Sequence, residues 1–174
     1  MVIETERLLL RRFRDEDLPV VHRWHSDPRF VRHLTGRPFT RDETEATLRR
    51  WQGHWEQHGF GLRAVEWRET GELIGRAGAQ YHRLWPPDPE VGWALDPAWW
   101  GRGIATEAGA ASIAETFELG FDRVVSITTE QNVASRAVME RLGFTLLERI
   151  PFDDSRVADE LWVHALERRI FTSS

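Results

Sequence analysis

The residues with the clearest chemical potential are two glycines in the segment W-W-G-R-G-I-A-T-E-A, residues 99–108. Gly101 and Gly103 permit backbone conformations that other residues resist, and they let a ligand approach the main chain closely. The segment lies between a predicted strand and a predicted helix, whose first turn presents unpaired N–H groups and the positive end of its dipole. The pattern favours a binding site for a phosphate or pyrophosphate. A tight turn that only starts the helix is the alternative.

Two common phosphate-binding motifs do not match this segment. A P-loop requires G-K-[S/T] after its glycines, but Ile104 and Ala105 follow Gly103 and the chain contains no lysine. A Rossmann fingerprint requires a third glycine where Thr106 stands, and no first strand of a Rossmann unit precedes the turn. The sequence therefore excludes a P-loop NTPase and disfavours a dinucleotide site.

Asn132 is the only asparagine in the chain, and Ser135 follows it at the start of another predicted helix. Asparagine is a preferred helix N-cap, and a serine in the first turn often supports the cap. That structural role alone accounts for the pair. The absence of asparagine from every other cap and turn favours a separate need for the amide, so both interpretations stay open.

The elements that position these residues follow from local signals. A first strand is predicted over residues 7–13, and Asp15 begins a helix to about residue 25. Asp27 and Pro28 start a second, short helix. A capping box of Thr40 and Glu43 opens a third that ends at Gly59. Residues 61–67 and 72–81 are predicted to form two strands that are joined as a hairpin.

The second half alternates strands and helices. Residues 84–89 read as a stiff proline-rich loop, and later elements are strands 90–95, 124–129, 144–149 and 159–166, with helices 104–119 and 132–142. The central strand–helix–strand unit is expected to be parallel and right-handed. The fold class is therefore α/β (α+β), a mixed sheet flanked by helices.

Composition limits the function classes. A length of 174 residues suggests one domain, residues 1–174, and the absence of cysteine excludes disulfides, thiolate zinc sites and a cysteine nucleophile. No apolar run is long enough for a membrane span and the first residues are charged, so a cytoplasmic protein without membrane contact is expected. A net charge of −5 weighs against nucleic acid as a partner and tolerates a cationic partner such as an amine.

Taken together, the chain resembles the GNAT superfamily of acyl-CoA N-acyltransferases. The resemblance rests on W-G-R-G-I-A-T-E-A after a short strand, followed by N-V-A-S and R-L-G-F, in that order. The opening I-E-T-E-R-L-L-L-R-R-F resembles the ribosomal-protein (RimJ/RimL-like) branch. The resemblance spans nearly the whole chain, and it implies a GNAT fold that uses acetyl-CoA as co-substrate.

The resemblance also assigns roles to particular residues. Asn132 would hydrogen-bond the pantetheine arm of CoA, and Ser135 would lie near its sulfur and donate to the leaving thiolate. Many relatives use a tyrosine there, but the only tyrosine here is Tyr81, in a different strand. The pantetheine amides would pair, like an added strand, with Trp93, Ala94 and Leu95. The CoA pyrophosphate would bind the backbone amides of Gly101, Arg102, Gly103, Ile104, Ala105 and Thr106.

Acyl transfer to an amine requires a neutral amine, a donor for the oxyanion and a proton for the thiolate. Glu90, at the start of the strand that would hold pantetheine, is the best candidate base, acting through water. An ordinary exposed carboxylate is the alternative, and Asp88 and His82 are weaker candidates. A backbone N–H near Leu95 would serve as the oxyanion donor.

No metal is expected. His54 and His58 have the spacing H-x-E-x-H rather than H-E-x-x-H and lack a third ligand, so they indicate a solvated helix face. Glu107, in the first turn of its helix, is expected only to complement the helix dipole. The N-terminal helices, residues 15–58, would shape the acceptor site with Trp24, Trp51 and Trp55.

The leading hypothesis is direct transfer of an acetyl group from acetyl-CoA to a primary amine, either a protein N-terminus or a small molecule. The acidic groups among those tryptophans favour an aromatic, cation-tolerant acceptor pocket, and the protein would be a monomer or homodimer. Three alternatives remain open: another acyl donor such as succinyl-CoA, a non-catalytic acyl-CoA-binding domain, and a nucleotide-binding module.

Overall fold

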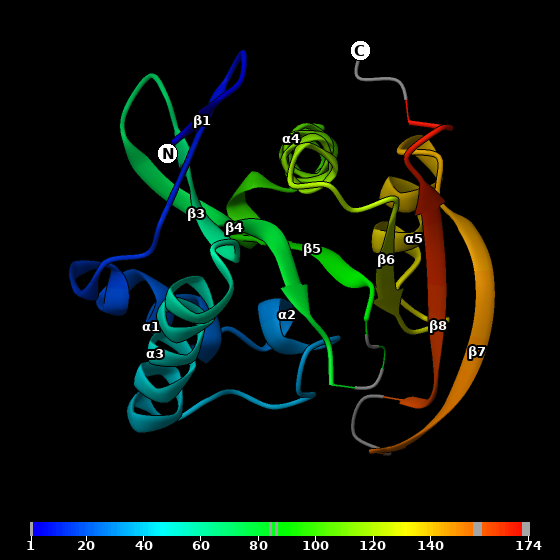
Figure 1. Cartoon of the computed structure of the whole chain (residues 1–174). Helices are drawn as coiled ribbons and strands as arrows, with labels where there is room; N and C mark the ends of the chain where they lie inside the picture. Colours follow the sequence, from blue (N-terminus) through cyan, green and yellow to red (C-terminus); the bar gives the residue numbers. More distant parts are fainter. Residues whose placement is uncertain (1, 84, 86, 155–157, 172–174) are drawn as a thin grey trace.

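The computed structural model describes residues 2–83, 85, 87–154 and 158–171. Its centre is a single eight-stranded sheet with strand order β1-β2-β3-β4-β5-β6-β8-β7. The helices cover both faces of the sheet (Figure 1). The strands are β1 Ile3–Glu4, β2 Leu8–Arg11, β3 Leu62–Trp67, β4 Glu72–Tyr81, β5 Pro89–Leu95, β6 Arg123–Thr128, β7 Thr145–Asp154 and β8 Ala158–Glu167. The α-helices are α1 Leu18–Ser26, α2 Pro28–Val31, α3 Arg41–His58, α4 Ile104–Glu118 and α5 Val133–Arg141.

Local sequence signals determine most helix ends. The capping box of α3 is present, since the Thr40 side chain accepts from the Glu43 N–H and the Glu43 carboxylate accepts from the Thr40 N–H. Gly59 ends this helix in the left-handed region at φ 76°. The Asp27 side chain caps α2 by accepting from the Arg29 N–H. The predicted starts of both helices and the predicted end of α3 are confirmed.

Three details differ from the sequence-based expectation. The first helical segment is divided into a 3-10 turn, Asp15–Asp17, and α1. The short strand β1 was not predicted, because two residues carry no detectable alternation. Strand β7 continues past residue 149 to Asp154, since its antiparallel pairing with β8 continues that far. In the predicted proline-rich loop, residues 84 and 86 lie outside the described part of the chain.

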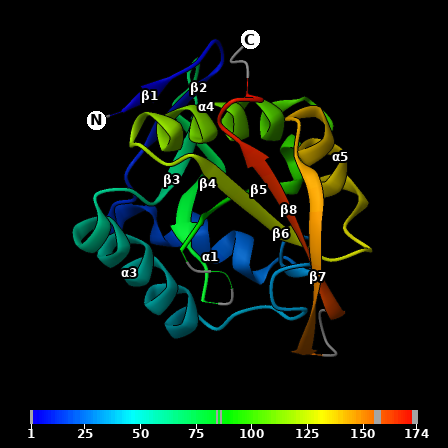
Figure 2. The same ribbon diagram turned by 45° about the vertical axis from the view of Figure 1, so that its right-hand side comes forward.

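Two helix layers enclose the sheet. Helices α4 and α5 lie on one face and α1 and α3 on the other (Figure 2). Trp24, Trp51 and Trp55 are 1%, 6% and 6% exposed, so they belong to the core beneath α1 and α3. The expectation that these tryptophans form an acceptor pocket is therefore wrong, because burial of their large apolar rings stabilises the fold instead.

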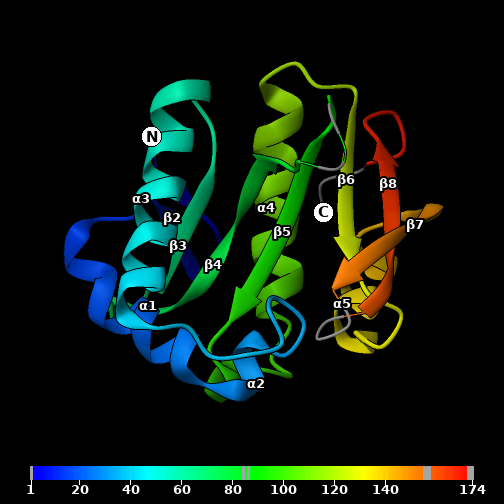
Figure 3. The same ribbon diagram turned by 90° about the horizontal axis from the view of Figure 1, so that it is seen from below.

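The feature that matters for function is the separation of β5 from β6. Strand β5 pairs with β4 along its whole length, from Pro89 to Leu95. Its parallel pairing with β6 consists of one position, Glu90 with Val125. Beyond this position the two strands diverge (Figure 3). The predicted parallel strand–helix–strand unit is confirmed, and its two strands enclose a gap.

Candidate active site

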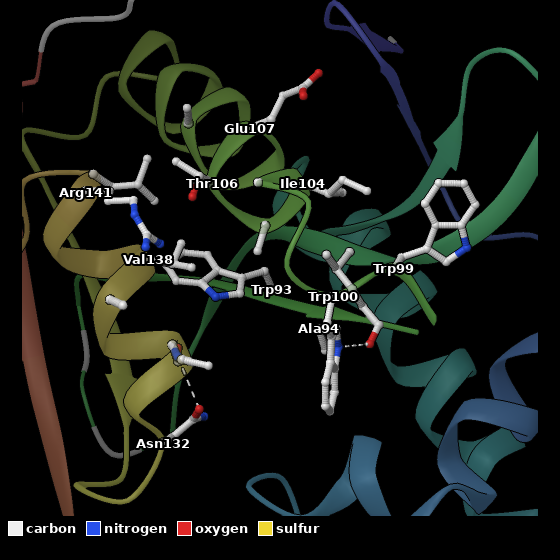
Figure 4. A pocket seen from close by; sticks show the side chains of 18 of the residues that line it. Trp93, Ala94, Trp99, Trp100, Ile104, Thr106, Glu107, Asn132, Val138 and Arg141 are labelled. Atoms are coloured by element: carbon white, nitrogen blue, oxygen red, sulfur yellow. Dashed lines mark hydrogen bonds between the residues drawn. The ribbon is translucent and has the colours of Figure 1, made fainter. Parts of the chain in front are cut away.

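A cleft of about 1620 Å³ lies beside the end of β5, between α4 and α5. Its walls come from β5, the glycine turn, α4, α5 and the segment around α2. Figure 4 shows Trp93 between α4 and α5, with Asn132 at one end of α5 and Trp100 below the turn. The cleft therefore brings together the two motifs that the sequence analysis singled out.

The glycine turn has the geometry of an anion site. Gly101 and Gly103 both lie in the left-handed region, at φ 76° and 74°. Gly103 is the N-cap of α4 and supplies no side-chain cap, so the first-turn N–H groups have no capping acceptor. Ile104, Ala105 and Thr106 line the cleft at this helix start. The guanidinium of Arg102 instead stacks over the Trp99 ring at 4.8 Å.

The N-terminal strand pair holds this turn in place. The Thr5 hydroxyl donates to Glu107 Oε1 at 2.5 Å, and the Arg7 backbone N–H donates to the same oxygen at 2.9 Å. The Arg7 guanidinium donates to Glu107 Oε2 at 2.7 Å and to the Arg102 carbonyl at 3.0 Å. The role of Glu107 therefore extends beyond the helix dipole. Burial raises the pKa of Glu107, but the hydrogen bonds from Thr5 and Arg7 together lower it by more, so its pKa lies below the usual value.

The edge of β5 that faces β6 is open. The Asp96 N–H donates to the Ile74 carbonyl at 2.8 Å, and the alternation of an antiparallel pair then turns the backbone groups of Ala94 toward β4. The same alternation turns those of Trp93 and Leu95 toward the gap. The Leu95 carbonyl there accepts from the Trp100 indole at 2.8 Å (Figure 4). Of the three residues predicted on this strand, two thus present backbone groups to the cleft.

The floor of the cleft depends on a glycine in α4. A Cβ added to Gly109 would lie 2.9 Å from Leu142 and 3.1 Å from the Trp93 ring. Glycine at this position therefore permits close packing of Trp93 against α4, and a larger residue would require Leu142 and the Trp93 ring to shift. This packing keeps the indole within the cleft and beside the open strand edge.

Asn132 and Ser135 lie together in the cleft wall. Asn132 is the N-cap of α5, and its Oδ1 accepts from the Ser135 N–H at 3.2 Å. The capping role is thus present, and it uses only the oxygen of the amide. Both residues line the cleft, so the amide N–H₂ of Asn132 and the hydroxyl of Ser135 are available for a ligand.

Glu90 lies on β5 at the position where this strand pairs with β6, and it is not among the residues that line the cleft. Gln80 Nε2 lies 3.5 Å from its carboxylate. Ala94, two positions further along the alternation, packs against the core of α1 and α3, so Glu90 shares that face rather than the face covered by α4. Asp88, the weaker candidate base, is paired with Arg123 at 2.6 Å.

The histidine pair on α3 has backbone contacts. His54 Nδ1 lies 2.8 Å from the Phe60 carbonyl, and its Nε2 lies 3.1 Å from the Tyr81 N–H. One neutral tautomer satisfies both contacts, and burial lowers the pKa of His54. Within the described residues, no group of three or more His, Cys, Asp or Glu side chains is placed to hold a metal ion.

Several cleft residues were not found from the sequence. Arg141 on α5 points into the cleft (Figure 4), and α2 contributes Arg29 and Phe30. Arg7 was missed as a support of the turn, although it belongs to the N-terminal segment that carries the family resemblance. A helical pattern identifies the face that is buried, but it does not identify which exposed residues border a cleft.

A mixed sheet with two splayed parallel strands, a glycine turn and an uncapped helix start defines an acyltransferase architecture. The chain belongs to the GNAT acetyltransferase family: the family model described as "Acetyltransferase (GNAT) domain" matches residues 7–145. Members of this family use acetyl-CoA. Within the described part of the chain, no helix has the length and apolar character needed to cross a membrane.

Individual relatives agree with this assignment. The chain is 28% identical over 149 residues to the uncharacterized N-acetyltransferase YoaA of Bacillus subtilis, with 82% of each chain covered. An acetyltransferase structure from Agrobacterium tumefaciens has a TM-score of 0.84 at 32% identity, covering 97% of this chain and 95% of that one. The RimL ribosomal L7/L12 acetyltransferase in complex with CoA has the same fold, with a TM-score of 0.79 at 20% identity and coverage of 96% and 98%. The fold expected from the resemblance is confirmed.

Proposed function

We propose that this protein is an N-acetyltransferase that transfers the acetyl group of acetyl-CoA directly to a primary amine. The observation that carries the proposal is the cleft beside the diverging end of β5. It is lined by the uncapped start of α4 and by the open strand edge at Trp93 and Leu95, and Glu90 lies further back on β5, where this strand pairs with β6. This sequence of features suits an anionic head, an amide-containing arm and a reactive end.

Each part of CoA has a complementary group in the chain. The N–H groups of residues 101–106 suit the pyrophosphate, as helix N-termini do in general. The open edge at Trp93 and Leu95 suits the pantetheine amides, which would add to the sheet as a further strand. The amide N–H₂ of Asn132 suits a carbonyl of the same arm. Bound in this way, acetyl-CoA supplies an acetyl group activated as a thioester.

The remaining residues act on the amine and the carbonyl. Glu90 accepts the amine proton through a water molecule while the amine nitrogen bonds to the acyl carbon and the carbon–sulfur bond breaks. The Ser135 hydroxyl donates a hydrogen bond to the departing sulfur. Trp93 N–H lies nearer to Glu90 along β5 than Leu95 N–H does, so it replaces the Leu95 region as the donor to the carbonyl oxygen. An α-amine, with a pKa near 7.7–8.0, needs less help from Glu90 than a lysine near 10.4.

Calorimetry with CoA, ATP and NAD, followed by thiol release with a panel of amines, tests the proposal. Of these three ligands, we expect only CoA to bind. We expect Gly103→Ala to weaken binding about 10-fold, because a non-glycine residue in the left-handed region is strained by roughly 1–2 kcal/mol. Gly53→Ala, at a helix position where an added Cβ meets no atom within 4 Å, is the matched control.

The outcomes separate the alternatives. Preference for ATP or NAD over CoA would contradict the proposal. CoA binding without thiol release for any amine would indicate a non-catalytic binding domain. Faster turnover with succinyl-CoA than with acetyl-CoA would change the acyl group and leave the mechanism intact.

A further inference from the structure

The face of the sheet opposite α4 carries Arg76, a cation that has no ion-pair partner among the described residues, and Glu90. On this face β4 contributes Arg76 and Gln80, and β5 contributes Glu90, Gly92 and Ala94. The register pairs Arg76 with Ala94, Gly78 with Gly92 and Gln80 with Glu90. Arg76 and Glu90 therefore lie on one surface, separated by the pair of glycines.

Gly92 leaves open space on this surface. A Cβ added to Gly92 would meet no heavy atom within 4 Å, whereas one added to Gly78 would lie 2.5 Å from the Gly61 carbonyl oxygen. The open space is therefore at Gly92, where no side chain projects between Arg76 and Glu90. We call this space the Gly92 hollow.

Arg76 lacks the polar contacts that a guanidinium of this kind normally has. Its guanidinium stacks over the Trp51 ring at 5.4 Å. Its Nε is buried without a hydrogen-bond acceptor, and its side chain has no ion pair within the described residues. A buried N–H left unsatisfied costs about 1–3 kcal/mol, so the fold retains Arg76 at an energetic cost.

The electrostatic surroundings of Arg76 are mostly positive. Burial lowers its pKa to about 10, Glu90 opposes this shift and Arg50 adds to it. Arg76 consequently stays charged at neutral pH. Besides burial, the positive charge of Arg76, followed by those of His22 and Arg50, lowers the pKa of His25. The region therefore attracts an anionic group and does not form the cation-tolerant pocket expected from the sequence.

We propose that Arg76 binds the carboxylate of the amine acceptor in the Gly92 hollow, so that the acceptor is a primary amine carrying a carboxylate nearby. This inference rests on the proposed acetyl transfer and specifies its substrate class. Arg76 pairs with the carboxylate while Glu90 faces the amine. The two charges of the hollow thus match the two ends of one zwitterionic acceptor, and the guanidinium obtains the acceptor that it lacks within the chain.

The test compares acceptors that differ only in the carboxylate. One arm uses L-amino acids and their C-terminal amides, and the other uses short peptide amides that begin with Asp or with Asn. The measured quantity is the ratio of kcat/KM for the charged and neutral members at saturating acetyl-CoA. In whichever of the two arms the wild type prefers the charged acceptor, we expect Arg76→Met to lower this ratio about 10- to 100-fold. Comparing ratios between variants cancels differences in amine basicity.

Gly92→Asp and Gly92→Asn provide a second pair of variants that retains Arg76. The two side chains have the same size, and a Cβ at position 92 meets no heavy atom within 4 Å. The aspartate places a carboxylate in the hollow, so we expect it to lower the ratio about 10-fold relative to the asparagine. Arg49→Met, at an exposed pair with Glu45, is the control for a lost surface charge.

The results distinguish this inference from the proposed function. Acetylation of neutral amines with an unchanged ratio in Arg76→Met and in Gly92→Asp would overturn the inference and leave the proposed function standing. A protein that binds CoA but acetylates no acceptor of either kind would overturn both. Retained CoA binding by calorimetry verifies that each variant is folded.

Discussion

At the scale of single residues, the site depends on side chains whose functions are divided between structure and chemistry. The oxygen of the Asn132 amide caps α5, and its N–H₂ group has no hydrogen-bond partner among the described residues. The sequence predicted both roles but offered no means of choosing between them. Because a capping contact uses one atom of the amide, the two roles are compatible.

Glu90→Gln tests the assignment of the general base. The substitution retains the size of the side chain and its contact with Gln80, but it removes the ability to accept a proton. We expect kcat/KM at pH 7 to fall roughly 100-fold, the lower end of the range for general bases. The deficit should shrink as the pH rises, because the amine then loses its proton to solvent. A thiol-release assay from pH 6.5 to 9.5 measures this.

Asp88→Asn is the matched control for Glu90→Gln. Asp88 is also a carboxylate near the start of β5, but it is held by Arg123. We expect its loss to leave the shape of the pH–rate profile unchanged. A Glu90→Gln profile parallel to that of the wild type would remove Glu90 from the mechanism.

At the scale of elements, the N-terminal strands support the glycine turn across the sequence. Four hydrogen bonds join Thr5 and Arg7 to Glu107 and to the carbonyl of Arg102. Turn and helix signals are local, so the sequence predicted the turn and the start of α4. The contact between Arg7 and Glu107 joins residues 100 positions apart, and no local pattern predicts such a contact.

Arg7→Met tests this support. The variant keeps the apolar stem of the side chain and the backbone hydrogen bond to Glu107 Oε1, and it removes the guanidinium hydrogen bonds to Glu107 Oε2 and to the Arg102 carbonyl. We expect the turn to lose its fixed orientation and the Kd for CoA to rise about 3- to 10-fold, as for the loss of one or two hydrogen bonds. Calorimetry measures the Kd. Arg37→Met, which breaks an exposed pair with Glu43, should bind CoA like the wild type, and equal affinities of both variants would contradict the support role.

At the scale of the whole molecule, the order of elements and the parallel central unit were predictable because glycine, proline and capping residues mark almost every boundary. The divergence of β5 and β6 follows from no local signal in the sequence. Where the strands separate, Trp93 of β5 lies between α4 and α5 (Figure 4), so the arrangement involves several elements and no single strand encodes it. The positive surface around Arg76 was missed because its members come from α1, α3 and β4.

The same surface predicts how stability depends on pH. His25 is 1% exposed and lies 3.3 Å from the Thr44 hydroxyl. Burial, followed by the charges of Arg76, His22 and Arg50, lowers its pKa from 6.5 to about 4. The unfolded chain therefore takes up a proton at His25 near pH 6.5, whereas the folded chain does so only near pH 4. Between these values the unfolded state holds more protons, so acidification lowers the free energy of unfolding.

His25→Asn measures this contribution. Above pH 6.5, His25 should contribute nothing to the pH dependence of the free energy of unfolding. Below pH 6.5, the wild type should lose up to about 1.4 kcal/mol per pH unit through this residue. Urea unfolding at intervals from pH 7.5 to 4.5 gives the slope. His33 and His164, whose pKa values burial also lowers, contribute part of the total slope, so the relevant quantity is the difference between wild type and variant. Equal slopes in the two proteins would mean that His25 is protonated in the folded state and that the surface around Arg76 is less positive than the structure indicates.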